Sequence, residues 1–297
     1  MISVVISVYN GEAYLAEAIR SVLGQTGVEL ELIVVDDGST DSTPAVARAF
    51  SDPRMTVLRQ ENRGVAAARN AGIERSRGEF IAFLDADDVW LPAKLRRQME
   101  LFARRPEVGV AYTGYVITDS GLRARGVVLQ GDLERWLLLE GNGQLLSSTG
   151  VVRRAALGDD LRFDERLSTS ADVDFAWRTT RLTQSGTVRA PLVLYRTHPR
   201  QMHMDLHQLE RDVLSVYDWV FPGDPRRRRG MANLYTRFAV REALDRRPGE
   251  AVAYARRVWS LDPARLALLP LDAARRRAVR AALGLAFRRL GRVPGAG

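Results

Sequence analysis

The chain contains no cysteine among its 297 residues. This absence excludes disulfide bonds, thiolate metal sites and a cysteine nucleophile, and it is compatible with a reducing cytosol. Lysine is nearly absent too, because Lys94 is the only one, so the formal net charge of +8 comes from arginine. Arginine suits phosphate recognition, but so complete a bias also reflects coding composition, and it carries little functional weight.

Long apolar runs are missing as well. None approaches the roughly 18 residues that a membrane-spanning helix needs. The chain enters a β-branched run at residues 2–8 without a basic leader or a small-residue cleavage site. We therefore expect a cytoplasmic protein, soluble or peripheral at the inner face of the membrane. With 46% hydrophobic and 27% charged residues the composition is that of an ordinary globular chain.

Strand-like and helix-like segments alternate over the first 115 residues, which predicts an α/β fold whose mostly parallel sheet is flanked by helices. The predicted strands of this part span residues 2–8, 32–35, 56–58, 80–84 and 108–112, and the predicted helices span residues 15–23, 65–75 and 92–105. Later segments are less regular, with strands expected at 148–152 and 187–195 and a helix at 172–184. After residue 200 the pattern is helical and rich in arginine, with a break expected at 222–229.

Three carboxylates stand together directly after the strand predicted at residues 80–84, in the run Asp85-Ala86-Asp87-Asp88. Such a cluster is unfavourable unless a cation neutralises it, and oxygen ligands of this kind suit Mg²⁺ or Mn²⁺ shared with substrate phosphates. A solvated acidic turn that caps the next helix is the alternative. Trp90, just beyond, either stacks on a sugar or packs in the core.

Two more polar segments follow predicted strands. Asp37, in the acidic run at residues 36–41, can accept hydrogen bonds from a base or a ribose, although Asp and Gly after a strand are also ordinary turn residues. Arg69, in the alanine-rich segment 62–72, either reaches a phosphate or belongs to a tightly packed helix. Because ligands of open α/β sheets bind beyond the carboxyl ends of the strands, we expect these residues at one edge of the sheet.

Taken together, these segments resemble the family 2 inverting glycosyltransferases of the GT-A fold. The matching motifs are Ser3-Val4-Val5-Ile6-Ser7-Val8-Tyr9-Asn10-Gly11, Ile33-Val34-Val35-Asp36-Asp37-Gly38-Ser39-Thr40-Asp41, Asn62-Arg63-Gly64 with Ala68-Arg69-Asn70-Ala71-Gly72, and Arg77-Gly78-Glu79-Phe80 continued to Asp88. The resemblance implies a Rossmann-like GT-A domain over residues 1–200, with a nucleotide-binding half (1–115) and an acceptor half (116–200). Residues 201–297 show no resemblance and are expected to form a separate helical, arginine-rich region.

The resemblance also implies roles for individual residues. The donor nucleotide is expected to contact Ser7, Tyr9, Asp37, Arg69, Asp85 and Ala86. Asp85 and Asp87 correspond to the outer carboxylates of the family's DxD motif, and Asp87 is expected to bind a Mn²⁺ or Mg²⁺ ion that bridges the diphosphate. His198 is expected at the metal or the diphosphate, or else it is an ordinary loop residue.

An inverting transfer needs a base that removes the proton of the acceptor hydroxyl. In the family this is an aspartate, usually preceded by another acid, at the start of a helix in the second half of the domain. Asp172 fits this place, whereas Ala171 stands where the preceding acid is usual. Asp174 is the rival, and both acids also suit a helix N-terminus without a catalytic role.

The sequence thus predicts an inverting glycosyltransferase of polysaccharide biosynthesis, with UDP-sugar as the first donor to consider and a hydroxyl of a glycan, lipid-linked glycan or small molecule as acceptor. The alternatives are a catalytically inactive sugar-nucleotide or glycan-binding scaffold, which Ala171 would suit, and a nucleotidyltransferase, whose basic glycine-rich loop is missing after the first strand. Arginines at 226–229 and 275–289 either bring basic helices to an anionic membrane or form a solvated face. Nucleic-acid binding is not expected, because these arginines lack interleaved aromatics.

Overall fold

The computed structural model describes residues 1–131, 147–167, 169–199, 201, 206–220, 222–244 and 246–266. Its strands are β1 (Ile2–Val8), β2 (Leu30–Asp36), β3 (Met55–Arg59), β4 (Phe80–Asp85), β5 (Val89–Trp90), β6 (Val108–Thr118), β7 (Ala124–Val128), β8 (Val151–Arg153) and β9 (Gln184–Arg196). Its helices are α1 (Leu15–Leu23), α2 (Thr43–Arg48), α3 (Val65–Arg75), α4 (Lys94–Arg104), α6 (Arg154–Leu157), α7 (Ala171–Leu182), α8 (Leu206–Val220), α9 (Arg226–Leu244), α10 (Pro248–Leu261) and α11 (Pro263–Leu266), and two 3₁₀ turns are η1 (Ser147–Thr149) and η2 (Gly158–Asp160). The predicted alternation of strands and helices is confirmed.

The described strands form one mixed sheet in the order β3-β2-β1-β4-β8-β6-β9-β5, with β7 paired to β6. The first four strands of this order are parallel, and β1 lies in their middle, so that Ser7 is level with Val35 on one side and Asp85 on the other. In the second half, β8 is antiparallel to both of its neighbours while β6 and β9 are parallel. The carboxyl ends of β1, β2 and β4 therefore meet at one edge, as predicted.

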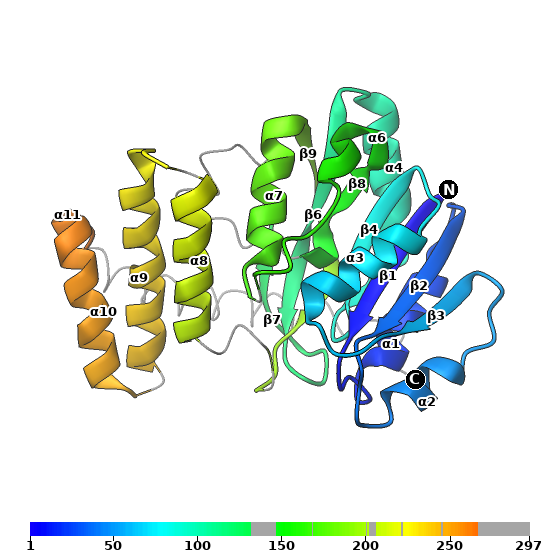
Figure 1. Ribbon diagram of the computed structural model, residues 1–297, viewed down its shortest axis with the longest axis horizontal. Coiled ribbons are helices and arrows are strands. Elements are labelled where there is room, and N and C mark those ends of the chain that lie inside the picture. Colours follow the sequence, from blue (N-terminus) through cyan, green and yellow to red (C-terminus); the bar gives the residue numbers. More distant parts are fainter. Residues whose placement is uncertain are drawn as a thin grey trace, which may run out of the picture.

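Helices cover both faces of the sheet (Figure 1). All seven residues of β1 are buried, and successive side chains of a strand point to opposite faces. Val5 belongs to the hydrophobic cluster that includes α3 and α7, whereas Val4 and Ile6 belong to the cluster that includes α1 and α4. Burial on both faces explains why β1 is a nearly continuous apolar run rather than an alternating one.

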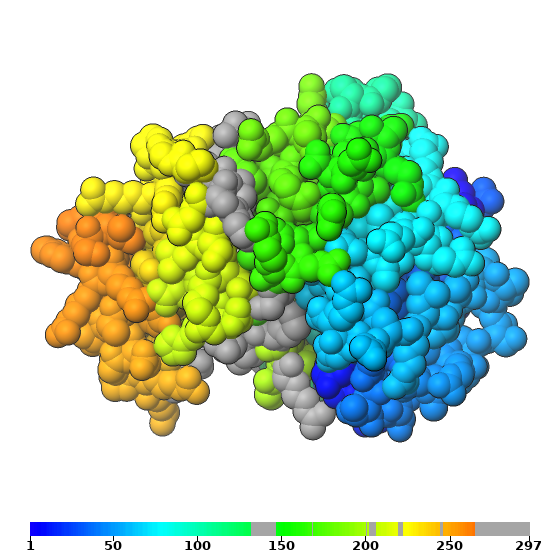
Figure 2. Space-filling model, viewed as in Figure 1, coloured from blue at the N-terminus to red at the C-terminus, as the bar shows by residue number. Residues whose placement is uncertain are grey.

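The helices α8, α9 and α10 stand side by side next to α7 (Figure 1), and in the space-filling view they form the yellow and orange lobe (Figure 2). Tyr235 of α9 and Tyr254 of α10 belong to the same hydrophobic cluster as Phe175 of α7. Asp212 of α8 accepts hydrogen bonds from the backbone nitrogen (2.6 Å) and hydroxyl (2.9 Å) of Thr169, just before α7. The helical lobe thus supports the element that carries the predicted base.

Two arginine-rich segments of the helical region were singled out from the sequence. Those at 226–229 open helix α9, so the break expected at 222–229 is shorter than predicted and ends before Arg226. Those at 275–289 lie outside the described residues. Over the ranges that the structure describes, no helix has the length and apolar character needed to cross a membrane.

Candidate active site

The loop after β1 is fastened to the loop after β2. The backbone nitrogen of Asn10 donates to Ser39 Oγ (2.9 Å), and the backbone nitrogen of Thr40 donates to Asn10 Oδ1 (2.8 Å). Asn10 has φ of 51°, a left-handed conformation in which asparagine is enriched. This fixed edge holds Ser7, which is 9% exposed, and Tyr9, whose 51% exposure leaves its ring accessible to a ligand.

Asp37, predicted at the nucleotide, is buried at the end of β2. Its Oδ1 accepts hydrogen bonds from the amide of Gln60 (2.8 Å) and the backbone nitrogen of Arg63 (3.0 Å), and its Oδ2 accepts one from the backbone nitrogen of Gly64 (2.8 Å). Gly64 has φ of 90°, which a residue with a Cβ adopts only under strain. Asp37 therefore shapes the loop that leads into α3, at the edge where the nucleotide is predicted.

The three carboxylates of the turn after β4 differ in burial: Asp88 is buried, whereas Asp85 and Asp87 are partly exposed. Asp88 is fully buried, and it accepts hydrogen bonds from Ser148 Oγ (2.6 Å) and from the backbone nitrogen of Arg196 (3.0 Å). Burial raises the pKa of Asp88, and the charges of Asp87 and Asp85 add to the rise. The side chains of Asp85 and Asp87 stay 31% and 26% exposed at the sheet edge, where they are accessible to a ligand.

Trp90 belongs to the core rather than to a sugar-binding surface. It is 2% exposed, its Nε1 donates to the carbonyl oxygen of Ser148 (2.7 Å), and the Lys94 ammonium lies 3.9 Å from the centre of its ring. Burial lowers the pKa of Lys94 well below its ordinary value. Helix α4 begins at Lys94 with Ala93 as its N-cap, so the acids of the turn do not cap it.

Asp87 meets His198, which is 111 residues away in the sequence. The distance from Asp87 Oδ2 to His198 Nε2 is 3.0 Å, and the Gln201 amide lies 3.4 Å from the same oxygen. The His198 ring packs against Tyr14 with 5.0 Å between ring centres. Arg196 Nε donates to the carbonyl oxygen of Asp87 (2.7 Å), which fixes the backbone of the turn. The structure therefore brings together the two residues that were predicted at the metal.

A divalent ion fits this pair only if a ligand completes its coordination. Within the described residues, no group of three or more histidine and acidic side chains is placed to hold a metal ion. Mg²⁺ in proteins commonly takes one or two carboxylates together with substrate phosphates. The 3.0 Å between Asp87 Oδ2 and His198 Nε2 matches neighbouring ligands of an octahedral ion with bonds of about 2.1 Å. The donors and their spacing thus fit an ion shared with a diphosphate.

Arg69 is buried inside the site and does not face solvent. It is 6% exposed, its guanidinium pairs with Asp85 Oδ1 at 2.7 Å, and it lies 4.9 Å over the ring of Phe163. Ala86, the remaining residue predicted at the nucleotide, is partly buried beside Gly11. The residues predicted at the donor therefore lie at or next to the carboxyl ends of β1, β2 and β4.

Asp172 lies in the first turn of α7 and lines a recess of about 320 Å³, a volume that includes its open mouth. The other described lining residues are mostly apolar: Phe83, Val110, Tyr112, Ser147, Gly150, Val152, Phe163, Phe175 and Ala176. Burial raises the pKa of Asp172 to about 6, opposed by the Arg69 charge and reinforced by Asp85. A carboxyl that titrates near neutrality is suited to take up a proton at physiological pH.

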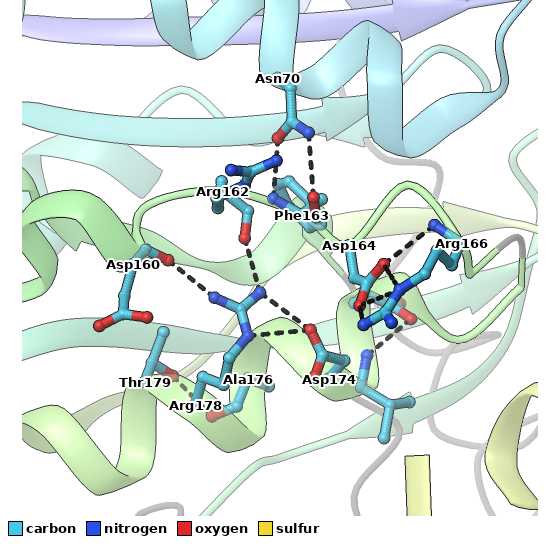
Figure 3. Close-up of polar contacts among 12 residues, drawn as sticks. Asn70, Asp160, Arg162, Phe163, Asp164, Arg166, Asp174, Ala176, Arg178 and Thr179 are labelled. Atoms are coloured by element: carbon cyan, nitrogen blue, oxygen red, sulfur yellow. Dashed lines mark hydrogen bonds and ion pairs between the residues drawn. The ribbon is translucent and has the colours of Figure 1, made fainter. Parts of the chain in front are cut away.

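Asp174, the rival base, is engaged in the structure. It is 3% exposed, and its Oδ2 pairs with the Arg178 guanidinium at 2.9 Å. The same guanidinium donates to the carbonyl oxygens of Asp160 (2.8 Å) and Arg162 (2.6 Å), as Figure 3 shows. Asp174 therefore orients an arginine that holds the preceding loop, while Asp172 keeps a side chain directed to the recess.

Two residues of the site were not assigned a role from the sequence. Ser148 joins the acidic turn to η1, because its Oγ donates to Asp88 Oδ2 (2.6 Å) and accepts from the backbone nitrogen of Asp85 (3.1 Å). A lone serine outside any motif gives no signal of this contact. Asn70 stood inside a quoted motif, and the structure shows it bonded to both backbone groups of Phe163, which only the fold brings near (Figure 3).

Comparisons with known proteins show the family of this chain. Residues 3–157 match the sequence model of the family described as glycosyl transferase family 2, so the chain belongs to this family. An uncharacterized glycosyltransferase of Nostoc sp. is 36% identical over 214 residues, which cover 68% of this chain and 66% of that protein. EpsH of Bacillus subtilis, which is named as a glycosyltransferase, is 34% identical over 211 residues, which cover 66% of this chain and 61% of EpsH. The chain thus matches about two thirds of the length of these relatives.

Solved structures show the same fold. TarS residues 1–349 of S. aureus, in complex with UDP-GlcNAc, gives a TM-score of 0.61 at 18% identity over 96% of this chain and 92% of that one. The mannosyltransferase PcManGT of Pyrobaculum calidifontis, in complex with GDP-Man and Mn²⁺, gives 0.59 at 19% identity over 96% and 80%. The expected GT-A architecture is confirmed.

Proposed function

We propose that this chain transfers a sugar from a nucleoside diphosphate donor to an acceptor hydroxyl, with inversion at the anomeric carbon. The observation that carries the proposal is the position of Asp172, a carboxyl with a pKa near 6, beside the Arg69–Asp85 pair at the edge where the nucleotide motifs end. A base and a donor site at one edge are what a direct displacement requires. Ala171, which replaces the acid usual in the family, is 1% exposed and packs in the hydrophobic core.

The donor would lie along the carboxyl ends of β1, β2 and β4. Tyr9 would offer an accessible ring for the base, Ser7 and Asp37 lie at the ends of β1 and β2, and Arg69 and Asp85 would border the ribose and diphosphate. Asp87 and His198 would hold a divalent ion, Mn²⁺ or Mg²⁺, which supplies positive charge against the leaving diphosphate. The fold neighbours solved in complex with UDP-GlcNAc, and with GDP-Man and Mn²⁺, support this proposal.

The transfer itself would proceed in one displacement. The acceptor oxygen attacks the anomeric carbon and loses its proton to Asp172, while the bond between that carbon and the diphosphate oxygen breaks. The nucleoside diphosphate leaves with the bonding electrons. The apolar walls of the recess keep Asp172 poorly solvated and therefore basic.

The acceptor is proposed to be a hydroxyl of a glycan or lipid-linked glycan. Two relatives support this class: the succinoglycan biosynthesis protein ExoO of Rhizobium meliloti, 46% identical over 100 residues, and TuaG of Bacillus subtilis, 39% identical over 118 residues and named for teichuronic acid biosynthesis. The basic start of α9 would suit an acceptor at an anionic membrane surface.

The first experiment is a titration of the purified chain with UDP, GDP and dTDP, each with and without Mn²⁺ or Mg²⁺, followed by the midpoint of thermal unfolding. A ligand that binds only the native state raises this midpoint by mass action. We expect one nucleotide to raise it in a metal-dependent way, and Asp87→Ala to abolish the metal dependence. Asp52→Ala, which removes an acid that pairs with exposed Arg54, is the matched control and keeps the response.

Turnover then separates an enzyme from a scaffold. The nucleotide identified in the titration sets the donor, and release of the nucleoside diphosphate is measured with saccharide acceptors. Nucleotide binding without release, in the wild type with each acceptor, would favour the inactive scaffold. A failure of every nucleotide to raise the midpoint at millimolar concentration would refute donor binding itself.

A further inference from the structure

The loop of residues 158–167 joins α6 to α7 and lies between α3 and α7 (Figure 3). Side chains from both helices hold it. Arg178 of α7 donates to the carbonyl oxygens of Asp160 and Arg162, and Asn70 of α3 bonds to Phe163. We call residues 158–167 the bridging loop, because α3 contributes to the donor side of the site and α7 carries Asp172.

Asn70 holds the bridging loop with an unusually complete set of bonds. Its Oδ1 accepts from the backbone nitrogen of Phe163 (2.8 Å), and its Nδ2 donates to the carbonyl oxygen of Phe163 (2.9 Å) and to Glu165 Oε1 (3.0 Å). Asn70 is 7% exposed, so these bonds form away from water. A buried amide that pairs with both backbone groups of one residue fixes the position of that residue on α3.

Phe163 contacts both sides of the site with one ring. The Arg69 guanidinium lies 4.9 Å from the ring centre and is paired with Asp85. The ring also stacks on Phe175 of α7, with 4.5 Å between centres and an interplanar angle of 14°. Phe175 follows Asp172 by three residues and therefore lies one helical turn away on the same side of α7.

We propose that Phe163, fixed by Asn70, is a positioning residue that sets the distance between the donor site and the base. The proposal rests on the proposed function, in which Arg69 and Asp85 border the donor and Asp172 takes the proton. A transfer of this kind is sensitive to alignment, because a misplacement of about 1 Å can cost about 100-fold in rate. Phe163 thus contacts both Arg69 and Phe175 of α7 through one ring.

A conservative substitution separates positioning from simple core packing. Phe163→Leu keeps an apolar side chain but removes the stacking and the face beneath Arg69. Phe102→Leu is the matched control, because Phe102 is also buried (3% exposed) and also lies under an arginine, Arg153, at 5.3 Å. Phe102 is on α4, in the hydrophobic cluster that does not include Phe163 and α7. Asn70→Ala keeps the phenyl side chain but removes its anchor on α3, so it tests the positioning of the same ring.

With the donor and acceptor of the wild-type reaction, we expect kcat to fall at least about tenfold in Phe163→Leu and Asn70→Ala. The KM for the donor should change less than about threefold, since Arg69 keeps its pair with Asp85. Phe102→Leu should keep kcat within about twofold at a temperature well below its unfolding midpoint. Equal kcat values for Phe163→Leu and Phe102→Leu would overturn the proposal.

Amide hydrogen exchange provides a readout that does not depend on turnover. We expect faster exchange over residues 158–175 in Asn70→Ala and Phe163→Leu, and wild-type exchange there in Phe102→Leu. Unchanged exchange in all three variants would refute the anchoring step even if the wild type proves inactive. A wild type that binds no nucleotide but shows the expected exchange pattern would refute the proposed function while the anchoring by Asn70 stands.

Discussion

The acidic turn after β4 and the first turn of α7 both place acids at one edge of the site. The partners of these acids come from different parts of the chain. In the turn, Asp88 is bonded by Ser148 and by the backbone of Arg196, which come from distant parts of the chain. In α7, Asp174 is paired with Arg178, only four residues further along the same helix. The turn therefore depends on tertiary structure, whereas the helix provides its own partner.

The comparison also separates structural acids from available ones. Asp88 accepts hydrogen bonds at both oxygens and Asp174 pairs its Oδ2 with Arg178, and both residues are buried. Asp87 and Asp172 have partners too, His198 and the backbone nitrogen of Val173, but both lie at the edge of the site. Burial and the partners of each carboxyl together are thus a better guide to its role than position in a motif.

The strongest test of this contrast is Asp172→Asn. Loss of the base should lower kcat about 1000-fold, within the range typical of general base catalysis. Stability at pH 7 should not fall, because the substitution removes a buried charge. Steady-state rates and thermal unfolding of the same sample check both parts, and a kcat within about tenfold of wild type would exclude Asp172 as the base.

Asp88→Ala should give the largest loss of stability. It leaves the backbone nitrogen of Arg196 and the hydroxyl of Ser148 without their acceptor, and buried unsatisfied donors cost about 1–3 kcal/mol each. We expect the free energy of unfolding in urea to fall by about 3 kcal/mol, against less than about 1 kcal/mol for Asp87→Ala. Equal losses in the two variants would contradict the division of the turn into structural and available acids.

Asp174→Ala should show the opposite pattern to Asp172→Asn, a loss of stability with little loss of activity. Removal of the carboxylate takes one partner from the Arg178 guanidinium, at a cost of about 2 kcal/mol, while the bonds of Arg178 to the carbonyl oxygens of Asp160 and Arg162 still hold the bridging loop. Measured well below the unfolding midpoint, kcat should stay within about threefold of wild type. A loss of activity as large as that of Asp172→Asn, in protein shown to be folded by circular dichroism, would reassign the base to Asp174.

Dependence on pH provides a milder test. The pKa of Asp172 is raised to about 6, so the base is protonated at lower pH and kcat should fall as pH drops below about 6. A raised carboxyl pKa contributes stability below the unfolded value near 4 and loses it as pH rises through about 6. Asp172→Asn should therefore raise the unfolding midpoint by about 2–4 °C at pH 7.5 relative to wild type, and by less at pH 4. The same gain at both pH values would contradict this assignment.

The smallest effect is expected at the rim of the bridging loop. Arg63 pairs with Glu165 at 2.8 Å, but its side chain is 64% exposed, and exposed pairs contribute about 0–1 kcal/mol. Arg63→Ala should change the free energy of unfolding by less than about 1 kcal/mol and leave kcat within about twofold. A tenfold loss of kcat would show that the loop is held at its rim rather than by Asn70.

The sequence predicted the parallel half of the fold well, because β1 and β2 are fully buried, mostly apolar strands separated by the amphipathic helix α1. The helix predicted at residues 65–75 has those bounds in the structure, and the polar residues after β1, β2 and β4 meet at one edge as expected. The meeting of Asp87 and His198 was predicted only through family resemblance, since nothing local links residues 111 positions apart.

The second half was predicted less fully, for a physical reason. Strand β8 has three residues and takes its place between β4 and β6 through tertiary contacts. Ser148, Phe163 and Asn70 acquire their roles from that arrangement, so no spacing in the chain signals them. The choice between Asp172 and Asp174 needed the Arg178 contacts, which depend on the course of the bridging loop.

The distance in sequence between Asp87 and His198 has a consequence for biosynthesis. At about 5–20 residues per second, the acidic turn leaves the ribosome roughly 5–20 s before His198 follows it 111 residues later. During that interval the nascent chain carries the nucleotide motifs without Arg196 and His198, the residues that brace and partner the turn. Metal-dependent nucleotide binding would thus begin only once β9 has entered the sheet, which makes it a reporter of the assembled sheet and not of the early parallel half alone.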